Sequence, residues 1–591
     1  MSMSPGARSP AVSGGALAPL VARLRGSQAE MGRQFGALMA EHGGFGPATQ
    51  LYAGPPTMAA RIIASGLPYR LRPAVERAAD ALLGRQRARL NARRRRAFPE
   101  YVARTETAFA ELGIDVDKAS AVFVMDVLQN AIGLVSRTGM FGAHTAGAAV
   151  PACSSLAVWG EATVDGELRH ARNFDFPGAS IWDLAPVVVF CEPTNGLRYG
   201  FVTTRGLDAP GITCFNEAGL TLTVHTRFHR DVNYSGTSVI DLGHEVIRTA
   251  SSIDDAIATT RRLGAASTWG LLVSSASEQR AVVIETTGRA VEVIEPAAGT
   301  HHQSCTNRYL SEVLQRDEVT TSTAFAVDSD SRFAQLEAFV AKATGGIDGD
   351  DLEELLGDYA APGIVDRRPG VTRLSGNSVV SPISVAAIVA EPATRAIRVS
   401  VGRAPSGFGP YMKVPWSWDG PVGIVDEAFE VGPTRGRSHH GTALTETERA
   451  VARTFSRVTQ EFVDGTAPHL IRAEFEELTH RVPDEPGFHT MAAFMAIIDG
   501  EMRAALSHLD HALELESTPH PRARLLLFRS RVLEVEGDSS GARQARDELL
   551  AMSDPLTQHE RDAAAAEAIG PMRRSKLRRL TLDLFNLDAH H

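Results

Sequence analysis

A cysteine stands at the head of a segment whose composition predicts a β-hairpin. From Cys153 onward the chain reads CSSLAVWGEATVDGELRHARNFDF, in which two β-rich runs flank the turn dipeptide Asp165-Gly166. Such a hairpin folds Arg172 and Asp175 back towards Cys153. A guanidinium beside a thiol favours the thiolate, which is the nucleophilic form of cysteine. The segment therefore predicts a cysteine nucleophile with charged neighbours.

Three short strings follow the cysteine in order along the chain: RNFD, CTNRY and DSRF. Together with Cys153 they resemble the cysteine branch of the Ntn-hydrolase superfamily, in which the nucleophile is the first residue of the mature chain. The resemblance is greatest to the autoproteolytic acyltransferases of peptidase family C45, which are isopenicillin N acyltransferase-like and related to choloylglycine hydrolase and acid ceramidase. The early string RGSQAEMGRQFG resembles the family's pro-segment, and FNEAGL resembles its entry into a strand. One such string occurs by chance in many chains, whereas Cys153 and the three strings in the family's order are specific.

The resemblance implies a precursor that cuts itself between Ala152 and Cys153. The thiol of Cys153 attacks the Ala152 carbonyl, an N-to-S acyl shift gives a thioester, and water releases the front of the chain. The new α-amino group, with an ordinary pKa of about 8, then serves as the base for the thiol.

The same resemblance assigns roles to the residues of the three strings. Asp175 holds and orients the new amine, and Asn307 donates to the tetrahedral oxyanion. Arg172 and Arg332 favour the thiolate and anchor polar atoms of the substrate. No cofactor and no metal ion enter this chemistry.

The sequence leaves the second oxyanion donor open. Several relatives carry an asparagine a few residues after the Gly-Leu of the strand entry, where this chain reads Val224-His225-Thr226. His225 is either a donor through its ring N–H or an ordinary histidine of the sheet, and we favour the second interpretation. The candidates for substrate or oxyanion contacts are His225, Thr226 and Asn173.

These residues need stacked sheets to position them, and the chain has the matching pattern. Short β-branched runs separated by turn signals follow Gly139, with helical stretches around them, which predicts an α+β sandwich. The resemblance implies the αββα form of this sandwich found in Ntn-hydrolases. We expect a disordered lead-in over residues 1–26, a helical pro-segment over 27–152, the Ntn-hydrolase core over 153–430, and an all-helical C-terminal domain over 442–591.

The helical tail carries a weak repeat signal. Asp464-Gly465, Asp499-Gly500 and Glu536-Gly537 recur at spacings of 35 and 37, each between helical segments. That pattern is typical of degenerate tetratricopeptide (TPR-like) repeats, but an ordinary helical bundle with coincidental turns fits it equally well.

Composition narrows the compartment and the partners. The chain has 591 residues, 43% hydrophobic and 22% charged, with a net charge of -10, so nothing points to nucleic acid as a partner. Four scattered cysteines indicate a reducing, cytoplasmic location, and no window is apolar enough for a transmembrane segment. His301 and His302 lie near Cys305, but no further ligand at a suitable spacing completes a metal site.

The sequence thus favours a self-processing amidohydrolase or N-acyltransferase that acts on a linear C–N amide bond of a small molecule through a thioester acyl-enzyme. Its expected partners are that substrate, its own cleaved N-terminal chain and a protein bound by the C-terminal helices. The alternative is a scaffold protein that keeps a degenerate Ntn fold and binds partners through a TPR-like domain. Four aromatic residues either line an acyl pocket or belong to the core: Trp159, Phe174, Phe176 and Trp182.

Overall fold

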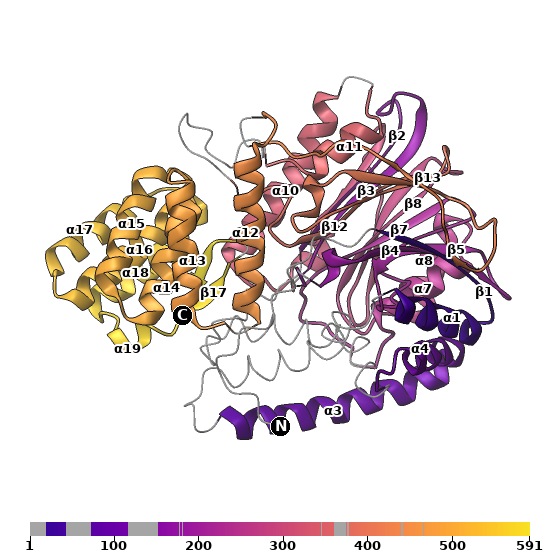
Figure 1. Ribbon diagram of the computed structural model, residues 1–591. Helices are drawn as coiled ribbons and strands as arrows, with labels where there is room; N and C mark the ends of the chain where they lie inside the picture. The colour runs from indigo at the N-terminus through magenta and orange to yellow at the C-terminus, as the bar shows by residue number, and fades with distance from the viewer. Residues whose placement is uncertain are drawn as a thin grey trace.

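The computed structural model describes residues 19–42, 72–115, 152–176, 178–179, 181–233, 235–343, 346–359, 374, 377–438, 441–464, 466–584 and 586–590. This part of the chain is mixed α+β, with two large sheets on one side and a group of helices on the other (Figure 1). The expected helices over residues 43–71 and 116–151 lie outside the described residues, as does Pro151 before the cleavage site.

The first sheet has nine strands in the described residues. Their order is β10 (Val291–Ile294), β9 (Arg280–Thr286), β8 (Trp269–Ser275), β7 (Leu220–Thr226), β6 (Thr213–Asn216), β5 (Tyr199–Thr204), β4 (Pro186–Pro193), β1 (Leu20–Gly26) and β15 (Gly423–Ile424). From β4 to β10 each strand pairs antiparallel with its sequence neighbour, as short connections allow. The sequence predicted six of these strands as β-branched runs between turns.

The second sheet carries the predicted nucleophile. Its seven strands among the described residues are β11 (His302–Cys305), β2 (Ala152–Gly160), β3 (Gly166–Asp175), β12 (Ser384–Glu391), β13 (Ala396–Ser400), β14 (Tyr411–Pro415) and β16 (Glu430–Val431). The β2–β3 hairpin of the sequence analysis is present, with Ala152 opposite Asp175 and Cys153 opposite Phe174.

Helices cover the outer faces of the two sheets. On the nine-stranded sheet, α7 (Val239–Thr249) packs on β6 and β7, and α8 (Ile253–Leu263) packs on β8, β9 and β10. On the seven-stranded sheet, α10 (Thr323–Lys342) contacts β11 and β2, and α11 (Gly349–Leu356) contacts β3 and β12. Strand β2 meets β7 across the inner faces, so the layers follow the order helix, sheet, sheet, helix (Figure 1). The short α9 (Glu312–Gln315) and the 3-10 turns Trp182–Leu184 and Ser406–Phe408 complete this part.

The expected disordered lead-in over residues 1–26 is wrong for its last residues, which form a strand. Residues 1–18 lie outside the described residues. Leu20–Gly26 form β1, which pairs in parallel with β4 in full register. Val21 and Leu24 are buried by this pairing, so contacts far along the chain impose a strand on a short and ambiguous local sequence. Three helices follow: α1 (Gln28–Glu41), α3 (Arg72–Ala97) and α4 (Pro99–Glu111).

The C-terminal part of the chain, from residue 441 onward, is called here the helical domain. Its elements are α12 (Glu446–Val463), α13 (Pro468–Arg481), α14 (Pro486–Asp499), α15 (Met502–Leu515), α16 (Pro519–Glu536), α17 (Ser539–Leu550), the turn Pro555–Thr557, α18 (Gln558–Ile569), α19 (Arg574–Leu577), β17 (Thr581–Asp583) and β18 (Asp588–His590). Gly500 and Gly537 end α14 and α16 in the left-handed conformation that glycine adopts without strain, so two of the recurring turns are helix ends. Asp464 follows the end of α12, and Gly465 lies outside the described residues. The β17–β18 hairpin departs from the all-helical expectation, and the TPR-like assignment stays a prediction.

Candidate active site

Cys153 is the second residue of β2 and lies between the two sheets. Its side chain is 2% exposed and belongs to the same apolar cluster as Phe174, its partner across the hairpin. On the same face of β3, two residues from Phe174, Arg172 donates from Nη2 to the Cys153 Sγ at 3.4 Å. The structure therefore brings the thiol and the guanidinium together as the hairpin predicted.

The thiol is nevertheless less acidic than an exposed cysteine. Burial raises the pKa of Cys153 above its ordinary value, and the favourable charge of Arg172 only partly offsets this effect. In the uncut chain the thiol is thus held protonated, although a guanidinium lies within reach.

The backbone of Cys153 is held at both ends of the residue. Its N–H donates to Asn307 Oδ1 at 2.9 Å, and its carbonyl oxygen accepts from Arg332 Nη1 at 2.7 Å. Arg332 also donates from Nη2 to Asn307 Oδ1 at 2.8 Å, so the two side chains that bind the Cys153 backbone also bind each other. Asn307 lies just after β11 and Arg332 lies on α10, so a neighbouring strand and the covering helix each supply one side chain that binds the Cys153 backbone.

Asn307 contacts the site through its oxygen, whereas we expected its amide N–H groups to point there. Its Nδ2 donates to the carbonyl oxygen of Thr226 at 3.1 Å, and this bond uses one of the two amide hydrogens. The second hydrogen on Nδ2 is available to donate a hydrogen bond to an oxyanion.

Asp175 ends β3, directly across the hairpin from Ala152. Its Oδ1 accepts a 2.5 Å hydrogen bond from Ser384 Oγ, while its Oδ2 accepts none from the residues that the structure describes. Burial raises the pKa of Asp175 to about 7, against the opposing charges of Arg332 and Arg172 and the hydrogen bond from Ser384. A carboxyl group with a raised pKa and one unused oxygen therefore lies opposite Ala152 of β2.

The three further candidates occupy different places. Asn173 points to the outer side of the sheet, where its Nδ2 donates to the carbonyl oxygens of Leu356 and Val379 at 2.7 and 2.9 Å, which is a structural role. Thr226 contributes its backbone carbonyl to Asn307, as described above. His225 is fully buried, and burial holds its pKa well below the ordinary value.

His225 differs from an ordinary, fully bonded sheet histidine. Its Nε2 lies 3.5 Å from Thr223 Oγ1, and its Nδ1 has no hydrogen-bond partner among the residues described. The nearby charges of Arg172 and Arg332 lower its pKa further, which places the neutral ring close to the same cluster. A ring nitrogen without a partner in the polar layer between the sheets is compatible with an oxyanion donor.

Both arginines direct most of their N–H groups to the protein. Arg172 donates to the carbonyl oxygens of Ile212 and Val224, and Arg332 donates to Asp328 Oδ2 at 2.8 Å and to Ser154 Oγ at 2.9 Å. This pattern favours positioning of Cys153 over the expected anchoring of substrate atoms.

Sequence reasoning missed several supporting residues. Asp328 precedes Arg332 by four residues on α10, an acid–base spacing that was visible in the sequence. Ser384 has no local signal, because it lies 209 residues from Asp175. The buried Arg227–Glu285 ion pair fixes the stretch that carries Asn307, since Arg227 donates to the Thr306 carbonyl at 2.6 Å.

The aromatic candidates divide into two groups. Phe174, Phe176 and Trp182 pack on one another beside Cys153, with ring centroids 4.8 to 6.0 Å apart. Trp159 belongs to a different apolar cluster, together with Leu168 and Leu272. Of the four aromatic candidates, only the first group shares an apolar cluster with Cys153.

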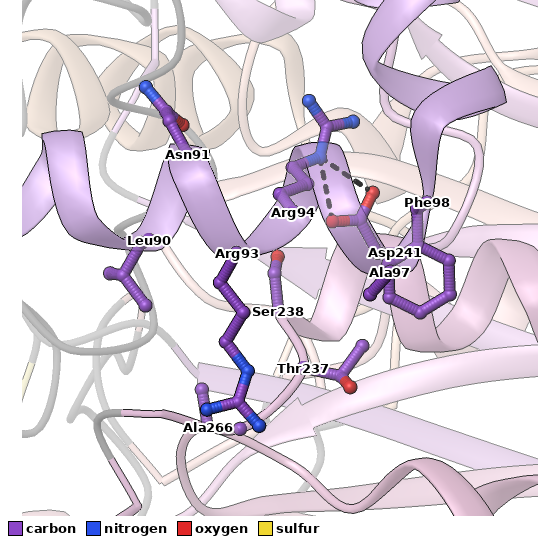
Figure 2. A pocket seen from close by; sticks show the side chains of 11 residues that line it. Leu90, Asn91, Arg93, Arg94, Ala97, Phe98, Thr237, Ser238, Asp241 and Ala266 are labelled. Carbon is purple, nitrogen blue, oxygen red and sulfur yellow. Dashed lines mark hydrogen bonds and ion pairs between the residues drawn. The ribbon is translucent and has the colours of Figure 1, made fainter.

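A separate small cavity lies between α3 and the start of α7 (Figure 2). Arg94 lines it and forms an ion pair with Asp241, in which the Arg94 Nε donates to both carboxylate oxygens, and Arg93 points away from that pair. None of the residues around Cys153 lines this cavity, so it belongs to the attachment of α3 rather than to the candidate active site.

Two further searches concern the described residues only. No three His, Cys, Asp or Glu side chains there are grouped to hold a metal ion. None of the described helices combines the length and the apolar composition needed to cross a bilayer.

The two stacked sheets thus place a cysteine, two arginines, an asparagine and an aspartate around one strand end. Residues 165–397 match the family described as acyl-coenzyme A:6-aminopenicillanic acid acyl-transferase. This match confirms the family resemblance that the motifs indicated. It includes Arg172, Asp175, Asn307 and Arg332, and it begins after Cys153.

Two solved structures are similar to parts of the chain. One is the N-acylethanolamine-hydrolyzing acid amidase ortholog of Caenorhabditis elegans, at 14% identity over 41% of this chain and 93% of that one, with a TM-score of 0.27. The other is penicillin V acylase from Agrobacterium tumefaciens, at 14% identity over 48% of this chain and 99% of that one, with a TM-score of 0.28. No curated protein matches the chain.

Proposed function

We propose that this protein is a self-processing N-terminal-cysteine amidohydrolase or N-acyltransferase that cuts a linear amide bond. One observation carries the proposal: the N–H, the carbonyl and the thiol of Cys153 are each bound by a different predicted residue, namely Asn307, Arg332 and Arg172. In an ordinary core strand the backbone N–H and carbonyl pair with other backbone groups, whereas here side chains more than 150 residues away bind both of them, and the thiol has a guanidinium beside it. The matched acyltransferase family supports the same chemistry.

Self-cleavage begins with the thiol of Cys153 and the carbonyl carbon of Ala152. The sulfur–carbon bond forms, the carbon–nitrogen bond breaks, and the proton of the thiol passes to the departing nitrogen. Asp175 has an unused oxygen and a pKa of about 7, so it is suited to relay this proton. Water then hydrolyses the thioester, which leaves a carboxylate on Ala152 and an amine on Cys153.

The released amine is the general base of the mature enzyme. This amine nitrogen is the backbone nitrogen of Cys153, which lies 2.9 Å from Asn307 Oδ1. Asn307 accepts a hydrogen bond from it and so orients its lone pair towards the thiol. A protonated amine nearby favours the ionised form of Asp175, so amine and carboxylate form a pair that can exchange a proton. Arg172 stabilises the thiolate when the amine takes the proton of the thiol.

Attack on a substrate amide produces an oxyanion that needs donors. The second amide hydrogen of Asn307 is one, and the neutral ring of His225 supplies the other through the nitrogen that lacks a partner. The acyl group rests against Phe174, Phe176 and Trp182, which favours an apolar or aromatic acyl chain. Water completes a hydrolase cycle, and an amine acceptor completes an acyl transfer.

The test is the fate of the bond before Cys153. Intact mass and N-terminal sequencing of the purified wild-type protein are expected to show two chains, the second starting at Cys153. The Cys153→Ala variant should remain one chain and have no activity on N-acyl amides, and Cys153→Ser should cleave slowly because the hydroxyl is the weaker nucleophile.

A wild-type protein that stays uncut on prolonged incubation contradicts the proposal and leaves the scaffold interpretation, in which the helical domain recruits partners. Cleavage of Cys153→Ala at the wild-type rate shows that another protease makes the cut. Cys191→Ala is the matched control, because it removes an equally buried thiol that lies on β4, away from the site.

A further inference from the structure

One short segment, residues 377–384, supports the candidate active site from behind. At its start, the N–H of Asn377 donates to Asp328 Oδ1 at 3.0 Å, and the Asn377 carbonyl accepts from Ser331 Oγ at 2.8 Å. Asp328 uses its other oxygen to hold Arg332, so the segment orients the arginine that binds the carbonyl of Cys153.

The end of the same segment supports the aspartate. Ser384 donates to Asp175 at 2.5 Å, and the carbonyl of Ile383 accepts from the N–H of Phe176, the next residue after Asp175, at 3.0 Å. Between the two ends, the carbonyl of Val379 accepts from Asn173. Residues 377–384 therefore contact the supports of both Arg332 and Asp175.

The apolar side chains of this segment divide between two cores. Val379 packs in the cluster beneath the seven-stranded sheet. Val380 and Ile383, which are 1% and 0% exposed, belong instead to the cluster formed by the helical domain, together with Phe455 and Leu582. The segment is thus held from one side by the catalytic sheet and from the other by the helical domain.

Other contacts fasten the helical domain to the same region. The N–H of Leu374 donates to Glu485, the capping residue of α14, at 2.5 Å. Arg449 of α12 donates to the carbonyl of Phe408 at 3.4 Å. Asp583 in β17 is buried, and burial is the main cause that raises its pKa to about 7. The negative charges of Asp588 and Asp328 act on this pKa in the same direction, so the terminal hairpin lies near Asp328, the ion-pair partner of Arg332.

We propose that the helical domain is a positioning module for the catalytic site, and that Val380 and Ile383 are the positioning residues through which it acts. By burying these two side chains the domain fixes segment 377–384, and the segment in turn holds Asp328 on Arg332 and Ser384 on Asp175. The inference rests on the proposed function, because the property that it explains is the alignment of the residues that cut the chain. It also assigns a role to the part of the chain that follows the family match.

The experiment follows self-cleavage of the full-length chain, which needs no external substrate. Ile383→Ala and Val380→Ala loosen the segment and should slow cleavage before Cys153 by about tenfold to a hundredfold, because small misplacements of reacting groups have effects of this size. The matched control is Leu549→Ala, which removes as many side-chain atoms as Ile383→Ala from a separate cluster of the helical domain. It should lower the thermal midpoint and leave the cleavage rate within about twofold of wild type, as should the conservative Ile383→Val.

The pH profile separates positioning from mere stability. The hydrogen bond from Ser384 lowers the pKa of Asp175, so its loss should raise that pKa. The midpoint of the pH profile of cleavage should therefore move to higher pH in Ile383→Ala. If Ile383→Ala lowers the thermal midpoint as the control does, yet cleaves at the wild-type rate with an unmoved profile, the inference is overturned. If Ile383→Ala does not fold, the same comparison is made on Val380→Ala. An uncut wild-type chain instead refutes the proposed function itself.

Discussion

The immediate surroundings of Cys153 have opposing effects on the pKa of its thiol. Arg172 lies 3.4 Å from the sulfur and favours the thiolate, while nearly complete burial favours the neutral thiol and outweighs it. Asp175 is affected similarly, because burial outweighs the favourable charges of two arginines. Burial thus shifts both groups towards their neutral forms, which suits the proposed precursor because it must fold before it reacts.

The raised pKa of Asp175 predicts a specific dependence of stability on pH. Its pKa in the folded chain is about 7 and its ordinary value is 3.8, so its contribution to stability is fully present below about pH 4 and is lost as the pH rises through 7. In the uncut Cys153→Ala background, Asp175→Asn should therefore become progressively more stable than its parent between pH 4 and 8. The difference is on the order of a few kcal/mol at the upper end, measured as the shift in thermal midpoint.

Asp165 is the matched control for this prediction. Its hydrogen-bonded ion pair with Arg169 lowers the pKa of Asp165 to about 2, so its contribution is present above the ordinary pKa and is lost as the pH falls. Asp165→Asn should be slightly less stable than the parent at neutral pH, by much less because the carboxylate is partly exposed. A stability difference for Asp175→Asn that does not grow with pH contradicts the assignment.

At the scale of elements, α10 places a charged pair behind the nucleophile. Asp328 and Arg332 are one helical turn apart on its buried face, and the helix points them at the backbone of Cys153. The β2–β3 hairpin supplies the other half of the site, and β11 brings Asn307 alongside β2.

Removal of the partner of Arg332 should therefore disable the site. Asp328→Asn leaves a buried guanidinium without its charge partner and should slow self-cleavage at least about tenfold, with a loss of stability of about 3 kcal/mol. The cleavage rate is measured by intact mass over time, and stability by thermal unfolding in the Cys153→Ala background.

Asp330→Asn, two residues further along the same helix, is the matched control. Its side chain is 61% exposed and its partner Arg308 also pairs with Glu318, so cleavage and stability should change little. Equal effects of the two substitutions would show that α10 needs the charges for helix stability and not for alignment.

At the scale of the whole molecule, the N-terminal section is part of the folded body. Its strand β1 is inserted between β4 and β15, and α1 packs against α4. On α4, Arg104 forms a two-pronged ion pair with Asp208 at 2.7 and 2.8 Å, fully buried beneath the helix. These contacts do not involve the bond before Cys153, so they persist after it is cut.

We therefore expect the two chains of the mature protein to copurify through gel filtration without denaturant. Arg104→Met leaves Asp208 buried without its charge partner, at a cost of about 3 to 5 kcal/mol, and should cause loss of the N-terminal chain after cleavage. Arg95→Met is the control, because Arg95 of α3 forms an exposed ion pair with Glu106 of α4. Retention of the N-terminal chain by Arg104→Met would show that β1 alone holds it.

Much of the site was readable from the sequence because its signals are local. The turn Asp165-Gly166 fixes the hairpin, the alternation of the two runs places Arg172 on the same face as Cys153, and the order of RNFD, CTNRY and DSRF identifies the family. The predicted strands and the helix ends at Gly500 and Gly537 were likewise local, since turn and cap residues determine them by their own conformations.

Only the tertiary structure decided what depends on burial and on contacts between distant segments. No local pattern makes Leu20–Gly26 a strand, joins Ser384 to Asp175, or divides the side chains of residues 377–384 between two cores. The same holds for the protonation of Cys153 and Asp175, because desolvation is a property of the packed interior and outweighs the charges that the sequence displays. The sequence by itself thus determined which polar groups could meet around Cys153, because its turn and motif signals are local, and the folded chain determined their charge, their orientation and the elements that hold them.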